Sequence, residues 1–381
     1  MTQTYRDAAV DADAVLDMIR RIVEVESPTS DKAGVNRVLD MLAAHFNGTG
    51  AMIERLPTPD GYGDMLRVRS DPARQARGIL VLAHVDTVHP LGTLKGALPY
   101  RRDGDKVFGP GIYDMKGGVI LAVAAFQRIV AAGRRTPLPV TFLFTPDEEV
   151  GSPVSRQMIE DEAVKNKYLL VVEPAREGGK IVTARKGIGR FIIKTKGRPA
   201  HAGSAHDKGR NAIRGMAEII LKIEGFTDYG RGITTSCGLI RGGTAANTIP
   251  EDCVMEADLR VCDRAAADEM VARFHGLTCS NPDVSVQITG GLNRPPFARD
   301  EKIDALFQVA HGLAKDIGFE LVSYPLAGGG SDGNFTVERG IATLDGLGVD
   351  GADAHTHQEH MLYSSIAPRL RLLQGLMETL G

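Results

Sequence analysis

The chain has 381 residues, of which 43% are hydrophobic and 24% are charged, and its formal net charge is −3. This length suits two domains better than a single core, and the composition is that of a soluble globular protein. The small net charge and the absence of Trp give no reason to expect a nucleic acid or an anionic membrane as a partner.

The N-terminal segment and the cysteines both favour a cytoplasmic protein. Residues 1–21 carry acidic side chains where a signal peptide needs a basic and then an apolar region. The longest apolar stretch, 119–126, is too short to span a membrane. Because no CxxC pair occurs, we expect no cysteine zinc site, and we expect the cysteines to be reduced and buried. They are Cys237, Cys253, Cys262 and Cys279.

In chain order, the first part of the sequence alternates helical patterns with short apolar runs. Apolar residues recur at helical spacing in some segments, and branched apolar residues run continuously in others. The patterns predict helices over 14–23, 34–45 and 117–132, and buried strands over 78–85, 138–144 and 167–172. Strands that alternate with helices indicate an α/β fold whose mixed, mostly parallel sheet has helices on both faces.

From about Arg185 the pattern changes. Residues 190–196 alternate apolar and polar side chains, as in a strand with one solvent-exposed face. The order strand, helix, strand, strand, helix, strand predicts a ferredoxin-like α+β domain. Its segments are 190–196, 211–223, 232–240, 253–261, 265–277 and 284–288.

After Pro295 and Pro296 the first style returns, with a helix over 302–317, a strand over 341–344 and a helix over 364–380. We therefore expect a catalytic domain in two parts, 1–183 and 297–381, interrupted by an inserted domain at 184–296.

His84 and Asp86 stand two residues apart at the end of the first buried strand. A period of two places both side chains on one face, and open α/β sheets bind ligands at the carboxyl ends of their strands. A histidine could bind a metal there while the carboxylate fixes its tautomer from behind. A solvated pair at a strand end is the alternative.

Asp114 lies in GPGIYDMKGG, between a glycine turn and a helical pattern. The segment lacks the third glycine of a dinucleotide motif and the Lys-Ser/Thr of a phosphate loop, so phosphate binding is not expected. An aspartate in a rigid turn suits a carboxylate that bridges two metals. Capping of the following helix is the alternative.

Glu148 and Glu149 follow the second buried strand, and Glu173 ends the third. In the adjacent pair, one glutamate could bind a metal while its neighbour accepts a proton from water. A solvated acidic turn is the alternative. Three successive strands thus each end in a residue that can bind a metal.

Near the C-terminus, the segment DAHTHQEHM contains His355, His357 and His360. An exposed polar loop is the alternative to metal binding for this segment, and we expect His357 and His360 to lie in such a loop.

Together these motifs resemble the M20 family of metallopeptidases, which includes glutamate carboxypeptidases, aminoacylases and succinyl-diaminopimelate desuccinylases. The resemblance extends over nearly the whole chain in family order. It rests on the His-x-Asp pair, GIYDMKGG, Glu-Glu, Glu173, GRPAHAG around His201, GGTAANTIP around Asn247 and the late AHT.

The resemblance implies a zinc exopeptidase fold and two divalent metals, zinc first, with cobalt or manganese as replacements. Asp114 would bridge the metals, with His84 and Glu173 on one and Glu149 and His355 on the other. Asp86 would support His84. Glu148 would be the general base that activates a metal-bound water, and the resulting hydroxide would attack the carbonyl.

The inserted domain would be the family's lid, which often forms a homodimer interface. There His201 resembles the histidine that stabilises the oxyanion, and Asn247 and Arg260 resemble residues that hold a substrate's carboxylate or carbonyl oxygen.

The glycine-rich stretch 327–333 resembles the substrate loop of glutamate carboxypeptidases, in which the backbone of Gly329 and Gly330 could receive a carboxylate. We therefore expect a glutamate carboxypeptidase-like enzyme with a small amide or peptide substrate, an N-acyl or N-aryl amino acid or a dipeptide, with a C-terminal acidic residue. An aminoacylase or deacetylase of the same family is an alternative. A serine hydrolase that uses Ser331, within a G-x-S-x-G match, is the alternative from another class.

Overall fold

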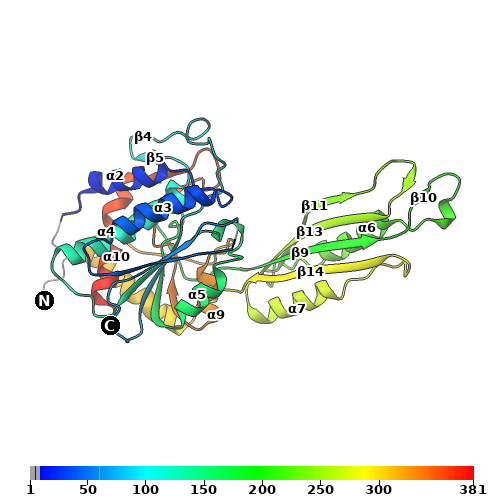
Figure 1. Ribbon diagram of the computed structural model, residues 1–381. Coiled ribbons are helices and arrows are strands. Elements are labelled where there is room, and N and C mark those ends of the chain that lie inside the picture. The colour runs from blue at the N-terminus through cyan, green and yellow to red at the C-terminus, as the bar shows by residue number, and fades with distance from the viewer. Residues whose placement is uncertain (1–4, 6–8, 60) are drawn as a thin grey trace. The chain divides into compact units, whose positions relative to one another are not determined.

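The computed structural model describes residue 5, residues 9–59 and residues 61–381 of the chain. Residues 1–4, 6–8 and 60 lie outside the described residues. The first two of these ranges belong to segment 1–21, whose sequence does not fit a signal peptide. The chain divides into two compact units (Figure 1). Unit 1 consists of Met1–Ala184, Arg299–Ala327 and Ser331–Gly381, and unit 2 consists of Arg185–Ala298 and Gly328–Gly330.

Unit 1 contains a six-stranded mixed sheet in the order β1-β2-β6-β3-β7-β16. The strands are β1 (Met52–Leu56), β2 (Met65–Arg69), β3 (Gly78–His84), β6 (Val140–Thr145), β7 (Asn166–Val171) and β16 (Ala342–Leu344). β3, β6, β7 and β16 run parallel, whereas β1 and β2 add two antiparallel pairs at one side. This confirms the mixed, mostly parallel sheet.

The helices of unit 1 cover both faces of this sheet. They are α2 (Ala12–Val23), α3 (Lys32–Ala44), α4 (Gly117–Ala131), α5 (Arg156–Ala163), α8 (Glu301–Ile317), α9 (Gly333–Glu338) and α10 (Ile366–Thr379). Successive residues of a strand point to opposite faces. Ile79 and Val81 of β3 therefore pack with α2, α3, α4, α8 and α10, while Leu80 and Leu82 pack with α5 and α9. In Figure 1, α2, α3, α4 and α10 lie on one side of the sheet and α5 and α9 on the other.

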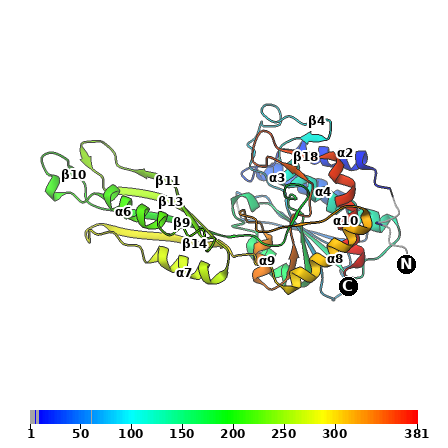
Figure 2. The same ribbon diagram turned by 180° about the vertical axis from the view of Figure 1, so that it is seen from behind.

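The sequence accounts locally for these helices. Asp11 and Asp300 cap α2 and α8, because each side chain accepts the backbone N–H three residues on. α8 ends at Gly318, whose φ of 102° suits a residue without a Cβ. α4 is apolar almost all round and is correspondingly buried, with α10 beside it (Figure 2).

Several elements of unit 1 were not predicted. β1 and β2 are only five residues long and include charged, partly exposed side chains, so their sequence carries no clear period. A small antiparallel sheet has the order β17-β18-β5-β4, and β8 pairs with β15. Their bounds are β4 (Arg101–Asp103), β5 (Lys106–Phe108), β8 (Ile181–Val182), β15 (Ser323–Tyr324), β17 (Gly351–Ala352) and β18 (His360–Leu362). One turn of 3-10 helix, η4 (Tyr363–Ser365), precedes α10.

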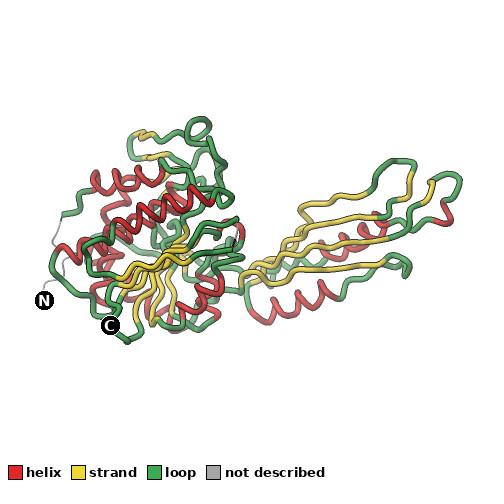
Figure 3. The backbone as a smooth tube through the Cα atoms, in the orientation of Figure 1, coloured by secondary structure: helices red, strands yellow, loops and turns green. Residues whose placement is uncertain are grey.

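Unit 2 contains a four-stranded antiparallel sheet in the order β11-β13-β9-β14 (Figure 3). Its elements are β9 (Gly187–Lys196), β10 (Ala200–His201), η3 (His206–Lys208), α6 (Ala212–Glu224), β11 (Thr234–Gly242), β12 (Thr248–Ile249), β13 (Asp252–Val261), α7 (Arg264–His275) and β14 (Ser285–Arg294). Buried and exposed residues alternate along β9 and β13. The buried side chains pack against α6 and α7, so this sheet has helices on one face only.

Candidate metal centre

Five potential ligands of unit 1 gather where its parallel strands end. His84 is the last residue of β3, Glu149 lies in the short helix η2 (Glu148–Val150) just after β6, and Glu173 follows β7. Asp114 lies in η1 (Ile112–Lys116), the irregular turn before α4, and His355 lies between β17 and β18. Because β3, β6 and β7 are parallel, their carboxyl ends meet at one edge of the sheet.

The carboxylate of Asp114 lies between two imidazoles. Its Oδ1 is 3.2 Å from Nε2 of His84, and its Oδ2 is 3.2 Å from Nε2 of His355. Each imidazole has a second carboxylate nearby. Oε1 of Glu173 lies 3.7 Å from Nε2 of His84, and Oε2 of Glu149 lies 3.3 Å from Nε2 of His355. The structure thus brings together all five predicted ligands, with the carboxylate of Asp114 between the other four.

The donor atoms are close enough to share ions. Potential ligand atoms of His84, Glu148 and Glu173 lie within 4.8 Å of one another, and so do those of His84, Asp114 and Glu149. Imidazole nitrogens with carboxylate oxygens are the ligand set that zinc and similar divalent metals accept in proteins.

The carboxylates of this cluster are crowded together, and one buried carboxylate oxygen has no partner among the described residues. Oε1 of Glu149 is buried and has no hydrogen-bond partner among the described residues. Burial, together with the charge of Asp114, raises the pKa of Glu149 to about 8. Burial and the same neighbour raise the pKa of Glu173 well above its ordinary value. Gathering carboxylates in this way is unfavourable unless cations join them, so the residues fit a metal centre.

Asp86 contacts the residues of the centre and is not itself one of the five predicted ligands. It is fully buried, and its backbone oxygen and Oδ1 lie 3.0 Å and 3.4 Å from Nδ1 of His84. Its Oδ1 accepts the N–H of Glu148 and its Oδ2 accepts the N–H of Glu149, both at 3.2 Å. Thr29 donates its hydroxyl to Oδ2 at 2.7 Å. One carboxylate therefore orients the ring of His84 and the turn that carries both glutamates.

The backbone around His355 has an uncommon conformation. Asp353 and His355 have φ angles of 62° and 65°, in the left-handed region that residues with a Cβ rarely adopt. Such conformations persist where surrounding contacts impose them, and they cluster at functional sites.

Sequence reasoning missed two residues that hold these ligands in place. Thr29 lies in a Ser-Pro-Thr-Ser break that signals only a turn. Glu359 is 1% exposed and accepts the backbone N–H of Asp114 at 3.0 Å. The one feature of the sequence that could have indicated Glu359 is its position four residues after His355.

Two expectations were wrong, those for the exposure of His360 and for the burial of the cysteines, and the Ser331 alternative is not supported. His360 is buried rather than exposed, because it lies on β18 with its ring 5.2 Å from the ring of Phe108. His357 is exposed, as expected. Ser331 is fully buried and donates its hydroxyl to Asp345 at 2.5 Å, so it is not placed to attack a substrate. Of the cysteines, all unpaired, only Cys253 is buried and the other three are partly exposed.

Unit 2 holds the remaining candidates. His201 and Asn247 are exposed neighbours there: β10 pairs with β12, and Ala202 donates its N–H to the backbone oxygen of Asn247 at 2.9 Å. Nδ1 of His201 accepts the N–H groups of Gly203 and Ser204 at 3.1 Å each.

Of the predicted carboxylate-binding residues of unit 2, Arg260, Gly329 and Gly330 lie together, whereas Asn247 lies beside His201, near the other end of β13. Arg260 pairs with Asp258 and donates to the backbone oxygen of Gly328 at 3.2 Å. The next residue, Gly329, accepts a hydrogen bond from the buried Arg185 at 3.1 Å, and Gly330 packs against Arg294. The glycine loop is thus bordered by arginine side chains.

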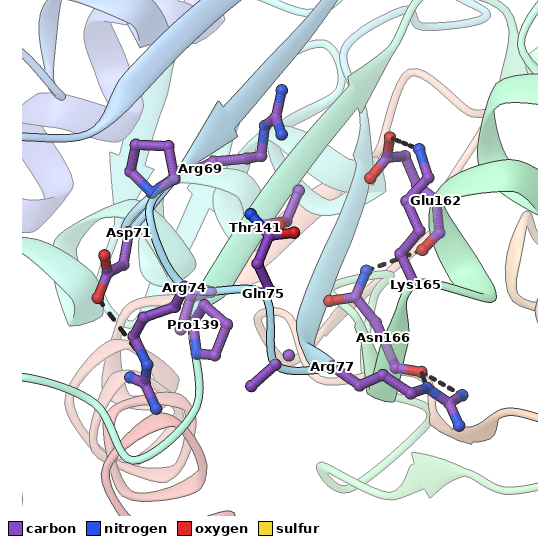
Figure 4. A pocket seen from close by; sticks show the side chains of 14 residues that line it. Arg69, Asp71, Arg74, Gln75, Arg77, Pro139, Thr141, Glu162, Lys165 and Asn166 are labelled. Atoms are coloured by element: carbon purple, nitrogen blue, oxygen red, sulfur yellow. Dashed lines mark hydrogen bonds and ion pairs between the residues drawn. The ribbon is translucent and has the colours of Figure 1, made fainter.

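A separate cavity of about 290 Å³ lies at the opposite edge of the sheet of unit 1 (Figure 4). It is lined by Gly78, Val140 and Asn166, the first residues of β3, β6 and β7. The charged side chains here are engaged with the protein: Lys165 pairs with Glu162, and Arg77 donates to the backbone oxygen of Asn166. The cavity therefore shows no set of ligands comparable to that at the carboxyl ends.

Within the described part of the chain, no helix is both long and apolar enough to cross a membrane.

A family model described as peptidase family M20/M25/M40 matches residues 80–379. Carboxypeptidase G2 of Pseudomonas sp. (strain RS-16) is 29% identical over 384 residues, which is 99% of this chain and 92% of that protein. Aminopeptidase PepT of Bacillus cereus ATCC 10987 shares the fold, with a TM-score of 0.77 and 22% identity over 97% of this chain and 98% of that one. So does the Bacillus subtilis YXEP protein, a dinuclear metal binding peptidase, with a TM-score of 0.69 and 15% identity over 97% and 99%. The chain therefore belongs to peptidase family M20/M25/M40 and is a hydrolase that acts on the C–N bonds of peptides.

Proposed function

We propose that the chain is a two-metal hydrolase that cleaves the amide or peptide bond of a small substrate. The observation that supports this most directly is that Asp114 directs one carboxylate oxygen to His84 and the other to His355. A carboxylate that serves two imidazole–carboxylate groups at once suits a pair of ions rather than one.

In this proposal His84, Glu173 and Asp114 hold one metal, and Asp114, Glu149 and His355 hold the other. Zinc is the first candidate, with cobalt or manganese as replacements, because all three accept nitrogen and oxygen ligands. The Bacillus subtilis YXEP protein, which has a similar fold, is a dinuclear metal binding peptidase. When bound, the metals would act as Lewis acids toward water and the substrate carbonyl.

Glu148 is the proposed general base. It lies beside Glu149, and one of its carboxylate oxygens lies within 4.8 Å of a potential ligand atom of His84 and of Glu173. Its backbone N–H donates to Asp86. A carboxylate at that place can accept the proton of the attacking water and return it to the departing amine. His201 would donate a hydrogen bond to the oxyanion, an interaction worth about 2.7–4 kcal/mol in other hydrolases.

Glu148→Gln tests this role. The amide cannot accept the proton, yet it leaves the five proposed ligands unchanged. We therefore expect wild-type metal content, measured by elemental analysis, together with a loss of almost all turnover. A variant that retained turnover would remove Glu148 from the mechanism.

For the substrate we propose an N-acyl or N-aryl amino acid or a dipeptide, with a C-terminal acidic residue preferred. The similarity to carboxypeptidase G2 and the arginines that border the glycine loop of unit 2 support this preference. Arg260 would bind the substrate's carboxylate, and the backbone of Gly329 and Gly330 would contribute to the same subsite. Asn247 lies beside His201, near the other end of β13, and would bind the carbonyl oxygen. Unit 2 would act as a lid. An aminoacylase or deacetylase is the alternative within the family.

We further propose a homodimer formed through unit 2 and a cytoplasmic location. β11 is an edge strand whose Leu239 and Ile240 are 54% and 51% exposed, and Leu221 of α6 is 76% exposed. An open edge that carries apolar side chains is suited to pairing with a second copy. The unpaired state of the four cysteines supports a reducing compartment.

The experiment that tests the activity is hydrolysis of a panel of N-acyl amino acids and dipeptides, with C-terminal Glu and Asp included. Activity should disappear after chelation and return with zinc, and acidic C-termini should be cleaved fastest. Activity that survives complete metal removal would overturn the two-metal proposal. Equal rates for all C-terminal residues would overturn the proposed preference.

A further inference from the structure

The buried carboxylate of Glu359 lies against the turn that carries Asp114. Its Oε1 accepts the N–H groups of Tyr113 and Asp114 at 2.9 Å and 3.0 Å. Its Oε2 accepts the N–H of Gly111 at 3.2 Å. Backbone N–H groups that converge in this way form an anion-binding concavity, and here the protein's own side chain occupies it.

His89 provides the fourth contact. It comes from the loop after β3, is 5% exposed, and places Nε2 2.5 Å from Oε2 of Glu359. Since this oxygen also accepts the N–H of Gly111, each carboxylate oxygen of Glu359 faces two hydrogen-bond partners. A carboxylate with four partners is fully satisfied despite its burial.

These contacts join the three segments that carry the two imidazoles and the shared carboxylate. Glu359 follows His355 by four residues, and its own N–H donates to the backbone oxygen of Thr356 at 3.2 Å, which closes the turn between them. His89 follows His84 by five residues in the same chain segment. The distance from Asp114 to each imidazole therefore depends on how firmly Glu359 is held.

We propose that Glu359 and His89 are positioning residues that set the affinity of the metal position formed by Asp114, Glu149 and His355. This inference rests on the proposed two-metal function. It concerns that position in particular, because His355 lies on an exposed loop between β17 and β18. His84 and Glu173, in contrast, are held by strands β3 and β7.

The fold itself does not depend on Glu359 alone. β18 and β5 already join the same two segments, with His360 opposite Phe108 and Met361 opposite Val107. A substitution that alters only the carboxylate should therefore leave the strands paired. Glu359→Gln is such a change. Glutamine has the size of glutamate but only one acceptor oxygen, whereas both carboxylate oxygens of Glu359 accept N–H groups.

The test is the zinc content of wild type, Glu359→Gln and a control, Glu177→Gln, which changes an exposed glutamate of unit 1. Each protein is dialysed against a series of buffered free zinc concentrations and analysed for metal per chain. We expect two ions for wild type and the control. For Glu359→Gln we expect one tightly held ion and a second whose affinity falls about 10- to 100-fold. Two ions of unchanged affinity in Glu359→Gln would overturn the role of Glu359.

A second pair of variants tests His89 and separates positioning from general loss of structure. Gln at position 89 can place an amide nitrogen where Nε2 lies, whereas Leu cannot. We expect His89→Gln to retain both zinc ions and His89→Leu to lose the weaker one, with circular dichroism unchanged in both. Retention of both ions by His89→Leu would overturn the role of His89. A wild type that binds no zinc would instead refute the proposed function itself, so the two failures are distinguishable.

Discussion

Asp86→Asn tests how strongly the residues behind the metal centre determine metal affinity. The substitution preserves the volume of a fully buried side chain but replaces one acceptor oxygen with an NH₂ group. If that group takes the place of Oδ2, it faces the N–H of Glu149. If it takes the place of Oδ1, it faces the N–H of Glu148 and the ring of His84. In either orientation one backbone donor loses its acceptor.

The magnitude follows from that lost acceptor. A buried donor left without a partner costs about 1–3 kcal/mol. The N–H groups of Glu148 and Glu149 are partly buried, so we expect the lower half of this range. In the metal-free protein the turn can shift to relieve this cost, and metal binding then has to restore it. About 1–2 kcal/mol of such cost corresponds to about a 5- to 30-fold weaker affinity. This agrees with the effect of about 10- to 100-fold that is typical when a partner of a metal-binding histidine is changed.

The assay is competition for zinc with a chromophoric chelator, followed by kcat/KM on the best substrate at saturating zinc. Asp103→Asn, on the exposed strand β4, serves as the matched control and should behave as wild type. A zinc affinity of Asp86→Asn within about twofold of wild type would refute the role of Asp86, because it would show that its hydrogen bonds do not orient the ligands.

Two further predictions concern residues outside the ligand set. Ser331→Ala should still hydrolyse substrate, but its free energy of unfolding in urea should fall by about 1–3 kcal/mol. The reason is the loss of the buried hydroxyl, which donates to Asp345 and accepts the N–H of Gly333. A variant with normal zinc content and no hydrolysis would instead support the serine mechanism. Burial lowers the pKa of His45 below its ordinary value of 6.5, so the folded state favours the neutral ring. The resulting stability is present above pH 6.5 and is lost as the pH falls toward the folded pKa. The free energy of unfolding of His45→Gln should therefore decline less than that of wild type in this window, and parallel pH curves would contradict the assignment.

Much of the fold could be predicted because the deciding signals are local. Continuous apolar runs mark β3 and β6, which are fully buried, and β7, whose last three residues are buried. The helical patterns end within a few residues of the ends of α2, α3, α4 and α10. Strands β1 and β2 escaped prediction because they are short and include charged residues that become partly buried only through ion pairs, such as Glu54 with Arg67. Such pairing arises from tertiary neighbours and leaves no periodic pattern.

The sequence by itself determined which residue types end each parallel strand. Since such strands have their carboxyl ends at one edge, it also determined that His84, Glu149 and Glu173 would meet. Only the tertiary structure decided that Asp114 places one oxygen toward each imidazole and that His360 is buried. Only it showed that Glu359 holds the turn of Asp114. Glu359 and Asp114 are 245 residues apart in the chain, and contacts over such a separation depend on how the sheet and its loops pack together.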